Sequence, residues 1–383
     1  MTSYPYAGDE MPGADAIRKR FDGVTALTIG LEEEVMLVDP DSLDLLPRAE
    51  EVVERAADPR FKLELPASQL EIVLPPTGTV AESIATLAAA RCDLAAAAEG
   101  VGLLLAAGVH PFAAPLGVLN RGERYRAIAR EYGDVARMQL VCALQVHVAV
   151  GGQERALAVY NALRSHLPEL AALAANAPFY AGRDTGLASV RPQIGELLPR
   201  QGVPPAFASW DDFADALRWG GFPAAQWWWE LRPRPALGTL ELRVPDTQTT
   251  VADAAAVAAL AHSLVAWLAE RHDAGDLPRP APTWQIEENR WAACRHGLDG
   301  VFADLATGAR LPVRELLAER IEALAPTAAR LGCAGELGEA KRLLGANGAE
   351  RQRAAAAGDA EAAARSIVSA YAPLRPSAMP AAR

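Results

Sequence analysis

The sequence predicts an α+β fold, with a mainly antiparallel sheet, helices packed on its outer face and a helical C-terminal part. Two observations predict this class. Strand-type runs and helical stretches are mixed between residues 25 and 250, whereas nearly everything after Thr250 has a helical pattern. Strands and helices do not alternate regularly, and no fixed-period repeat occurs, so a doubly wound parallel sheet is not expected.

We expect three segments along the chain. Residues 1–23 are short of apolar residues and contain Pro and Gly, which predicts a flexible N-terminal segment. Residues 24–345 are expected to form a single domain, with a sheet-forming part over 24–250 and a helical part over 251–345. Residues 346–383, rich in Ala, Arg and Glu, predict a C-terminal helix and tail.

The elements are expected in the following order. Residues 25–76 contain the strand-type runs TALTIGLEEEVMLVD and FKLELPASQLEIVLPP. Residues 79–108 are alanine-rich and helical, and Thr79 and Glu82 have the spacing of a capping box. A loop and helix over 117–139, a strand over 140–150 and a helical stretch over 153–176 follow.

The second half of the sheet-forming part is interrupted by a long irregular segment. Residues 177–207 are rich in Gly, Pro and Arg, and loops of this length inside a domain are often functional. SWDDFADALRWGG predicts a short helix, and residues 226–250 predict two strands joined by the turn PALG. The three tryptophans of QWWWE are expected mainly to pack in the core, and a place for one of them beside a ligand is the alternative. His110 is expected to be structural.

Composition limits the classes of function. The 383 residues are 51% hydrophobic and 22% charged, which is typical of a globular protein. The net charge of −11 disfavours non-specific nucleic-acid binding but not phosphate-bearing small molecules, whose charge a bound divalent cation can balance. No signal peptide or membrane span is expected, although residues 93–109 come nearest to a span. Four widely spaced cysteines predict free thiols in a cytoplasmic protein.

Four predicted strands share one pattern, because successive side chains of a strand point to opposite faces. Each strand has one apolar face and one face with carboxylate, imidazole or guanidinium groups. A solvated face is the ordinary explanation. However, these four stretches contain no lysine that could balance their carboxylates, so the carboxylates need a bound cation. Glu33 points to the apolar side and needs a partner of its own, such as an arginine. The polar faces carry Glu32 and Glu34; Gln69 and Glu71; Gln145 and His147; and Thr239, Glu241 and Arg243.

A divalent metal ion suits this set of side chains. Mg²⁺ prefers carboxylate oxygens and completes its coordination with water and substrate phosphates, and a single imidazole also permits Mn²⁺. No H-E-x-x-H motif or Cys/His cluster indicates zinc. The predicted metal ligands are Glu32, Glu34, Glu71, His147 and Glu241.

Arginines are expected to face the same wall. Guanidinium groups fit carboxylate and phosphate oxygens, and together with metal-bound phosphates they are typical of phosphoryl transfer. Ordinary surface ion pairs are the alternative explanation, most of all for Arg234. Neither a P-loop nor a G-x-G-x-x-G motif occurs, so ATP would bind without them, and no G-x-S-x-G motif indicates a serine hydrolase. The candidates are Arg183, Arg191, Arg232, Arg234 and Arg243.

Several stretches together resemble one family. GLEEEVMLVD, SQLEIVLPP, QVHVAV, APFYAGRDTGLASVR, ELRPRPALGTLELRVPDTQTT and ENRWAACRHGLDG occur in the order and spacing of carboxylate–amine ligases of the glutamate–cysteine ligase type 2 family. The resemblance runs from about residue 24 to about residue 340. It implies a fold like the catalytic domain of glutamine synthetase, in which a curved sheet binds ATP and divalent metals on its concave face.

The resemblance also implies a reaction and roles. ATP phosphorylates a carboxylate, an amine attacks the acyl phosphate, and ADP and phosphate leave. Glu32, Glu34, Glu71, His147 and Glu241 match metal-binding positions, and Arg183, Arg191 and Arg243 match positions that hold phosphate or a substrate carboxylate. We therefore predict Arg243, Arg191 and Arg183 as catalytic residues and expect Arg232 and Gln69 to join them in binding ATP. The family further implies a homodimer.

The sequence departs from the family pattern at some positions. Gln145 and Ala149 stand where the family has a histidine and a glycine, and Glu230 stands where aspartate is common. These positions are expected near the acyl or acceptor substrate, so the substrate pair is left open. The alternatives are a ligase for a peptide or natural-product carboxylate, a non-catalytic nucleotide or metabolite binder, and a guanidine-kinase-type phosphotransferase.

Overall fold

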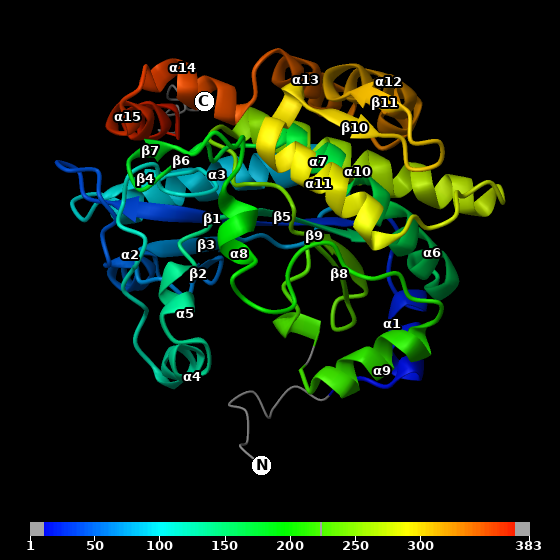
Figure 1. Cartoon of the computed structure of the whole chain (residues 1–383). Coiled ribbons are helices and arrows are strands. Elements are labelled where there is room, and N and C mark those ends of the chain that lie inside the picture. Colours follow the sequence, from blue (N-terminus) through cyan, green and yellow to red (C-terminus); the bar gives the residue numbers. More distant parts are fainter. Residues whose placement is uncertain (1–10, 223, 372–383) are drawn as a thin grey trace, which may run out of the picture.

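The computed structural model describes residues 11–222 and 224–371, and a seven-stranded antiparallel sheet lies at its centre (Figure 1). Six strands follow one another in the order β2-β3-β1-β5-β9-β8, and the short strand β4 pairs with β1. This architecture confirms the predicted α+β class. The strands are β1 (Ile29–Val38), β2 (Phe61–Leu63), β3 (Gln69–Val73), β4 (Leu103–Leu105), β5 (Leu144–Ala149), β8 (Leu231–Arg234) and β9 (Thr239–Leu242).

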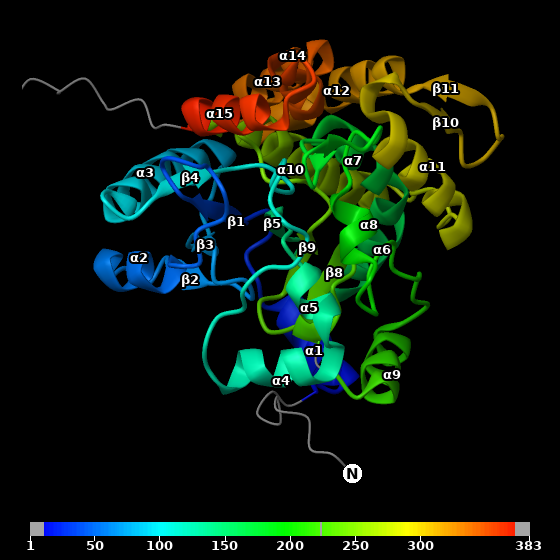
Figure 2. The ribbon, with the colours of Figure 1, turned by 60° about the vertical axis from the view of Figure 1, so that its left-hand side comes forward.

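Helices cover the apolar face of the sheet. The long helices α3 (Val80–Ala98) and α10 (Val251–Asp273) contact β1 and β5 respectively and pack against each other. In Figures 1 and 2 the C-terminal helices form a further layer beyond them, and α10 contacts α12 (Val313–Arg330) and α13 (Ala334–Gly345) of that layer. Leu31, Val35 and Leu37 of β1 are fully buried under this double layer, which is why the face has to be apolar.

The remaining helices flank these layers. α4 (Glu123–Tyr132) and α5 (Asp134–Met138) lie on the opposite side of the sheet from α3 in both views (Figures 1 and 2). Other helices in the described residues are α1 (Ala14–Asp22), α2 (Ala49–Ala56), α4 (Glu123–Tyr132), α5 (Asp134–Met138), α6 (Gln153–Leu163), α7 (Leu167–Leu173), α8 (Arg191–Gly195), α9 (Trp210–Gly220), α11 (Thr283–His296), α12 (Val313–Arg330), α13 (Ala334–Gly345), α14 (Gly348–Ala356) and α15 (Ala360–Tyr371), with short 3₁₀ turns η1 (Arg164–His166), η2 (Ala224–Gln226) and η3 (Gly297–Asp299).

Local signals located several boundaries correctly. Thr79 and Glu82 form the predicted capping box at the start of α3, and the Ser209 hydroxyl caps α9. The turn between β8 and β9 falls on PALG, where Gly238 has φ +71°, a conformation that favours glycine. All four cysteines are free, as expected.

Some expectations are wrong because tertiary contacts were not visible in the sequence. Residues 14–22, expected to be flexible, form α1, whose Phe21 is buried and stacks on Trp210 of α9 at 4.7 Å between ring centroids. Residues 1–10 lie outside the described part of the chain. The helical C-terminal part also contains a hairpin, β10 (Val301–Ala303) and β11 (Arg310–Pro312).

The expectation of which segment comes nearest to a membrane span needs correction. The segment is α10 rather than residues 93–109. Among the described residues, α10 is the one helix whose length and apolar composition would allow it to cross a membrane. However, 83% of the most apolar 18-residue stretch of α10 is buried inside the protein, and α10 is the central core helix. Its uniform apolarity reflects burial on all sides.

The partner that Glu33 required is Arg91 of α3. The guanidinium of Arg91 donates to both carboxylate oxygens of Glu33, at 2.8 and 2.5 Å, and also to the carbonyl oxygens of Gln248 and Thr249. Both side chains are buried, and the ring of Tyr371 in α15 lies over the guanidinium, 4.7 Å from its carbon. This pair therefore joins the sheet, α3 and the C-terminal helix.

Breaking this pair is expected to destabilise the protein strongly. Arg91→Leu leaves the Glu33 carboxylate buried without a partner, and the free energy of unfolding should fall by about 3–5 kcal/mol. Urea denaturation followed by circular dichroism measures the loss. Arg48→Leu, which removes an exposed ion pair with Glu51, is the control and should change the value by less than about 1 kcal/mol. Recovery of stability in the double variant Arg91→Leu/Glu33→Leu would confirm the mechanism, and a loss below 1 kcal/mol in Arg91→Leu would contradict it.

Candidate functional site

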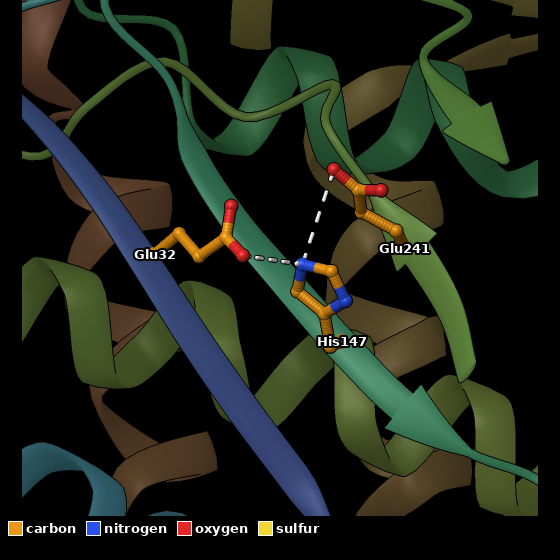
Figure 3. Close-up of side chains that lie close together, drawn as sticks. All are labelled: Glu32, His147 and Glu241. Atoms are coloured by element: carbon orange, nitrogen blue, oxygen red, sulfur yellow. Dashed lines mark ion pairs between the residues drawn. The ribbon is translucent and has the colours of Figure 1, made fainter. Parts of the chain in front are cut away.

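The register of the sheet brings one cluster of metal-ligand side chains together on the polar face. His147 on β5 lies opposite Glu241 on β9, and Glu32 on β1 lies opposite Gln145, two residues from His147. Figure 3 shows the three side chains converging. His147 Nε2 is 3.3 Å from Glu32 Oε1 and 3.9 Å from Glu241 Oε1, and one ligand atom from each residue lies within 4.8 Å of the others.

The geometry of His147 suits a cation. Its Nδ1 lies 3.2 Å from the Thr239 hydroxyl, whereas the buried Nε2 has no hydrogen-bond partner of good geometry among the described residues. When Nδ1 donates to Thr239, Nε2 presents its lone pair to the space that it shares with two carboxylates. An imidazole nitrogen and two carboxylate oxygens arranged in this way are a donor set for Mg²⁺ or Mn²⁺.

A second cluster consists of three carboxylates: Glu34, Glu64 and Glu71. Glu34 on β1 lies opposite Glu71 on β3, and Glu64 follows β2, which pairs with β3. One oxygen from each residue lies within 4.8 Å of the others. Burial and the neighbouring carboxylate of Glu34 raise the pKa of Glu64 to about 7. Burial together with Glu64 and Glu32 raises the pKa of Glu71 well above its usual range. Three converging carboxylates of this kind are destabilised unless protons or a cation neutralise them.

Glu64 was missed in the sequence. The structure shows that β2 pairs Lys62 with Glu71, so the residue two positions after Lys62 continues along the same face of the sheet. The alternation within FKLELP was a signal for this placement. It was not sufficient by itself, because β2 has only three residues and its pairing partner could not be known from the sequence.

Three arginines surround Glu241. Arg232 donates to both of its carboxylate oxygens, and Arg234 and Arg243 each donate to one, at 2.8 and 2.6 Å. Burial alone would raise the pKa of Glu241, but Arg232 and Arg243 hold it well below its usual range. Arg232 also donates to the carbonyl of Trp227. The structure thus shows Arg232 as a partner of Glu241, and Arg232 does not line the cleft described below. Its predicted role in ATP binding stays a prediction.

Gln145 links the two clusters. Its amide oxygen accepts a hydrogen bond from Arg243 Nη1 at 2.5 Å, and its amide nitrogen donates to Glu34 Oε1 at 2.8 Å. The backbone amide of Ala143 donates to the other oxygen of Glu34. Gln145 therefore orients Glu34 of the second cluster and Arg243, which in turn donates to Glu241 of the first cluster.

A cleft of about 480 Å³ opens beside the second cluster. The sheet side contributes polar groups, among them Glu34, Gln69, Glu230 and Arg243. The lining also includes Tyr125 and Ile128 of α4, Leu198 after α8, and Trp228 of the tryptophan segment, residues 226–230. The amide nitrogen of Gln69 is buried with no hydrogen-bond partner among the described residues. The cleft therefore joins the carboxylate cluster to an apolar and aromatic patch, within a lining that also includes Arg124, Glu196 and Gln201.

Arg191 and Arg183 have different positions. Arg191 lines the cleft, with its Nε bound to Asp246 at 2.7 Å and Nη2 bound to the carbonyls of Arg243 and Val244. Arg183 is exposed on the hairpin of β6 (Phe179–Tyr180) and β7 (Arg183–Asp184) and does not line the cleft. The neighbouring Asp184 pairs with Arg353 of α14, which holds this hairpin against the C-terminal helices. The structure thus does not bring Arg183 to the predicted site.

The other residues singled out earlier have ordinary structural positions, with one exception. His110 is buried and its Nε2 lies 2.8 Å from the carbonyl oxygen of Leu43, as expected for a structural histidine. Trp227 and Trp229 are core residues whose rings lie 4.6 Å apart. Trp228 is the tryptophan that lines the cleft.

Sequence comparisons match most of the chain to known proteins. The sequence profile of Glutamate-cysteine ligase family 2 matches residues 28–370. A protein provisionally named glutamate–cysteine ligase 2-3, from Rubrobacter xylanophilus, is 40% identical over 347 residues, which cover 88% of this chain and 94% of the relative. A relative with a similar provisional name from Thermobifida fusca is 36% identical over 349 residues, which cover 85% of this chain and 86% of the relative.

Two solved structures share the fold. Glutamate–cysteine ligase from Francisella tularensis, crystallised with AMP, superposes with a TM-score of 0.63 at 12% identity, over 91% of this chain and 90% of that one. A bifunctional glutathione synthetase from Pasteurella multocida superposes with a TM-score of 0.65 at 15% identity. The match covers 93% of this chain and about half, 53%, of that longer protein. At these identities the likeness concerns the fold alone.

Proposed function

The chain belongs to glutamate–cysteine ligase family 2, and from this premise we propose that it is an ATP-dependent carboxylate–amine ligase. The observation that supports this most is the pair of metal-ligand clusters on one face of the sheet, adjoining a cleft large enough for an organic substrate. A ligase that works through an acyl phosphate needs this combination of cation sites and substrate space, since both phosphate transfer and amide formation occur in one place.

The donor sets fit divalent cations. We propose that Glu32, His147 and Glu241 hold one Mg²⁺ and that Glu34, Glu64 and Glu71 hold another, with Mn²⁺ as a substitute. When bound, such cations neutralise phosphate oxygens and favour attack on the terminal phosphorus. The residues of the chain hold these positions in advance, because each ligand comes from a paired strand or its immediate end.

The reaction then follows in two balanced steps. A carboxylate oxygen of the donor forms a bond to the terminal phosphorus of ATP, and the bond to ADP breaks. The amine nitrogen next forms a bond to the acyl carbon, inorganic phosphate leaves, and the nitrogen loses a proton. We expect Arg243 and Arg191, which both line the cleft, to stabilise charge on the transferring group, and Gln69 to donate to a substrate oxygen. Proximity and electrostatics supply the rate, without a protein nucleophile.

The proposed function is tested by ADP release. Purified full-length protein is incubated with ATP, Mg²⁺ and pairs of carboxylic acids and amines, and the products are analysed by mass spectrometry. Release of ADP that depends on both partners, together with an amide product, is expected. ATP binding without turnover for any pair would favour the non-catalytic binder. A stable phosphorylated product without an amide would favour a guanidine-kinase-type phosphotransferase.

Magnesium binding is expected to depend on pH. Because the pKa of Glu64 is raised to about 7, protons compete with the cation below this pH, and Mg²⁺ should bind more tightly at pH 8 than at pH 6. The raised pKa also means that the metal-free protein loses stability as pH rises through about 7, since the folded state binds more protons than the unfolded state below it. Thermal-shift measurements at several pH values test both expectations: those with Mg²⁺ report its binding, and those without Mg²⁺ report the stability of the metal-free protein. Glu64→Gln should weaken the pH dependence, and an unchanged pH profile in that variant would contradict the assignment.

Two further features belong to the proposal. We propose a homodimer and a cytoplasmic location, on the family relationship and the free cysteines respectively. Light scattering of the purified protein tests the first, and fractionation of cells tests the second.

A further inference from the structure

The side chains that line the cleft outside the sheet indicate which class of substrate fits it. Tyr125 and Ile128 come from α4, Leu198 follows α8, and Trp228 precedes β8. These four side chains form an apolar and aromatic patch, although the same elements also contribute Arg124, Glu196 and Gln226 to the lining. The sheet side of the cleft contributes Glu34, Gln69 and Arg243. A small polar substrate would leave this patch in contact with water, which apolar surface disfavours.

Trp228 is held in place before any ligand binds. The guanidinium of Arg200 lies 5.3 Å from the centre of its ring, and the ring of Tyr132 meets it edge to face with centroids 5.9 Å apart. Arg200 is itself fixed, because it donates to the Tyr132 hydroxyl at 2.8 Å and to the carbonyl oxygen of Gln226 at 3.1 Å. An aromatic ring supported in this way is ready to pack against a flat apolar group without loss of side-chain freedom.

The sheet side offers a matching polar anchor. Gln69 is 2% exposed as a residue, and its side-chain amide nitrogen has no hydrogen-bond partner among the described residues. A buried donor of this kind is unfavourable unless an acceptor is supplied. A carbonyl or carboxylate oxygen of a substrate in the cleft would satisfy it, beside the guanidinium of Arg243.

Resting on the proposed ligase function, we propose that one of the two organic substrates carries a large apolar or aromatic group. This group packs between Trp228 and the α4 residues Tyr125 and Ile128. The polar head of the same substrate lies at the sheet, within reach of Gln69 and Arg243. The substrate class is therefore an amino acid, amine or carboxylic acid with a bulky apolar side chain, in contrast to the small thiol side chain of cysteine.

A matched substrate panel tests the proposal. Acids and amines are supplied in pairs that differ only in the side chain, such as alanine with phenylalanine, ethylamine with phenethylamine, and acetate with phenylacetate, together with glutamate and cysteine. ADP release is measured with saturating ATP and Mg²⁺. The bulky member of one series is expected to have a kcat/KM about 10- to 100-fold higher than its small counterpart. The series in which this occurs identifies the source as the amine or the carboxylate.

Variants of the apolar lining residues test their role apart from that of the other site residues. Trp228→Ala should lower kcat/KM for the bulky substrate about 10- to 100-fold, mainly through KM, and leave KM for ATP unchanged. Ile128→Phe, on a different element, should have the same effect by filling the cleft. Trp219→Ala is the control, since Trp219 is 90% exposed as a residue and does not line the cleft.

The outcomes distinguish this proposal from the proposed function. If glutamate and cysteine are the best pair and both wall variants behave as the native protein, the substrate class is wrong although the ligase function stands. A rise in KM for ATP in Trp228→Ala would place the nucleotide base on the ring and overturn the proposal. If no pair releases ADP, isothermal titration calorimetry measures binding of the same panel with Mg²⁺ and ADP present. Binding of the bulky members that is lost in Trp228→Ala supports the proposed substrate class, and no binding overturns it.

Discussion

Glu32→Gln is expected to lower Mg²⁺-dependent ADP formation by about 10³-fold or more while the protein stays folded. The substitution keeps the size of the side chain but removes one anionic oxygen from the set formed with His147 and Glu241. Several kcal/mol of phosphate charge stabilisation would be lost with the cation, and about 4 kcal/mol corresponds to a 10³-fold loss of rate. ADP release and Mg²⁺ titration calorimetry measure turnover and binding separately.

The control for this prediction is another glutamate. Glu54 lies exposed on α2, away from both clusters, so Glu54→Gln should leave turnover and Mg²⁺ binding unchanged. Circular dichroism establishes that both variants are folded. Native turnover in Glu32→Gln would remove the metal assignment for the first cluster.

Arg243→Gln is expected to reduce kcat by about 10²- to 10³-fold. Arg243 is the guanidinium that contacts both Glu241 and Gln145 and also lines the cleft, so its charge is placed between the two clusters and the substrate. Removal of one preorganised charged donor at developing phosphate or oxyanion charge has effects of this size. Arg243→Lys should restore little of the activity, because an ammonium group lacks the fork that reaches two partners. Single-turnover measurements with saturating ATP separate this loss from weaker binding.

The matched control is Arg234→Gln. Arg234 donates to the same carboxylate of Glu241 but does not line the cleft, so its loss should cost less than about tenfold in kcat. Equal losses in the two variants would mean that both arginines act only by holding Glu241, and the catalytic role of Arg243 would have to be given up.

Much of the fold was predictable because its signals are local. Strand alternation depends on the backbone of each segment alone, so the face on which Glu32, Glu34 and Glu71 lie could be predicted before any pairing was known. The capping box at Thr79 and the turn at Gly238 are likewise local features. The apolar opposite faces then required helices to cover them, and α3 and α10 do so.

The site was predictable only in part. Glu33 was expected to need a partner, but Arg91 is 58 residues away in the sequence and only the packing of α3 identifies it. Arg183 and Arg191 both fall in the irregular segment predicted over residues 177–207, yet Arg183 lies on β7, Arg191 begins α8, and only Arg191 reaches the cleft. Loop side chains have no fixed period, so their direction depends on where the loop docks.

The sequence by itself determined which residues share a strand face, and hence that carboxylates, an imidazole and guanidinium groups lie on one side of an antiparallel sheet. The tertiary structure decided how these residues divide into two clusters, that Glu64 belongs to one of them, and that Gln145 joins the two. It also decided that the tryptophan segment and α4 wall the cleft. The physical reason is that the direction of a side chain follows from its own backbone, whereas the distance between two side chains depends on strand register and helix packing between remote segments.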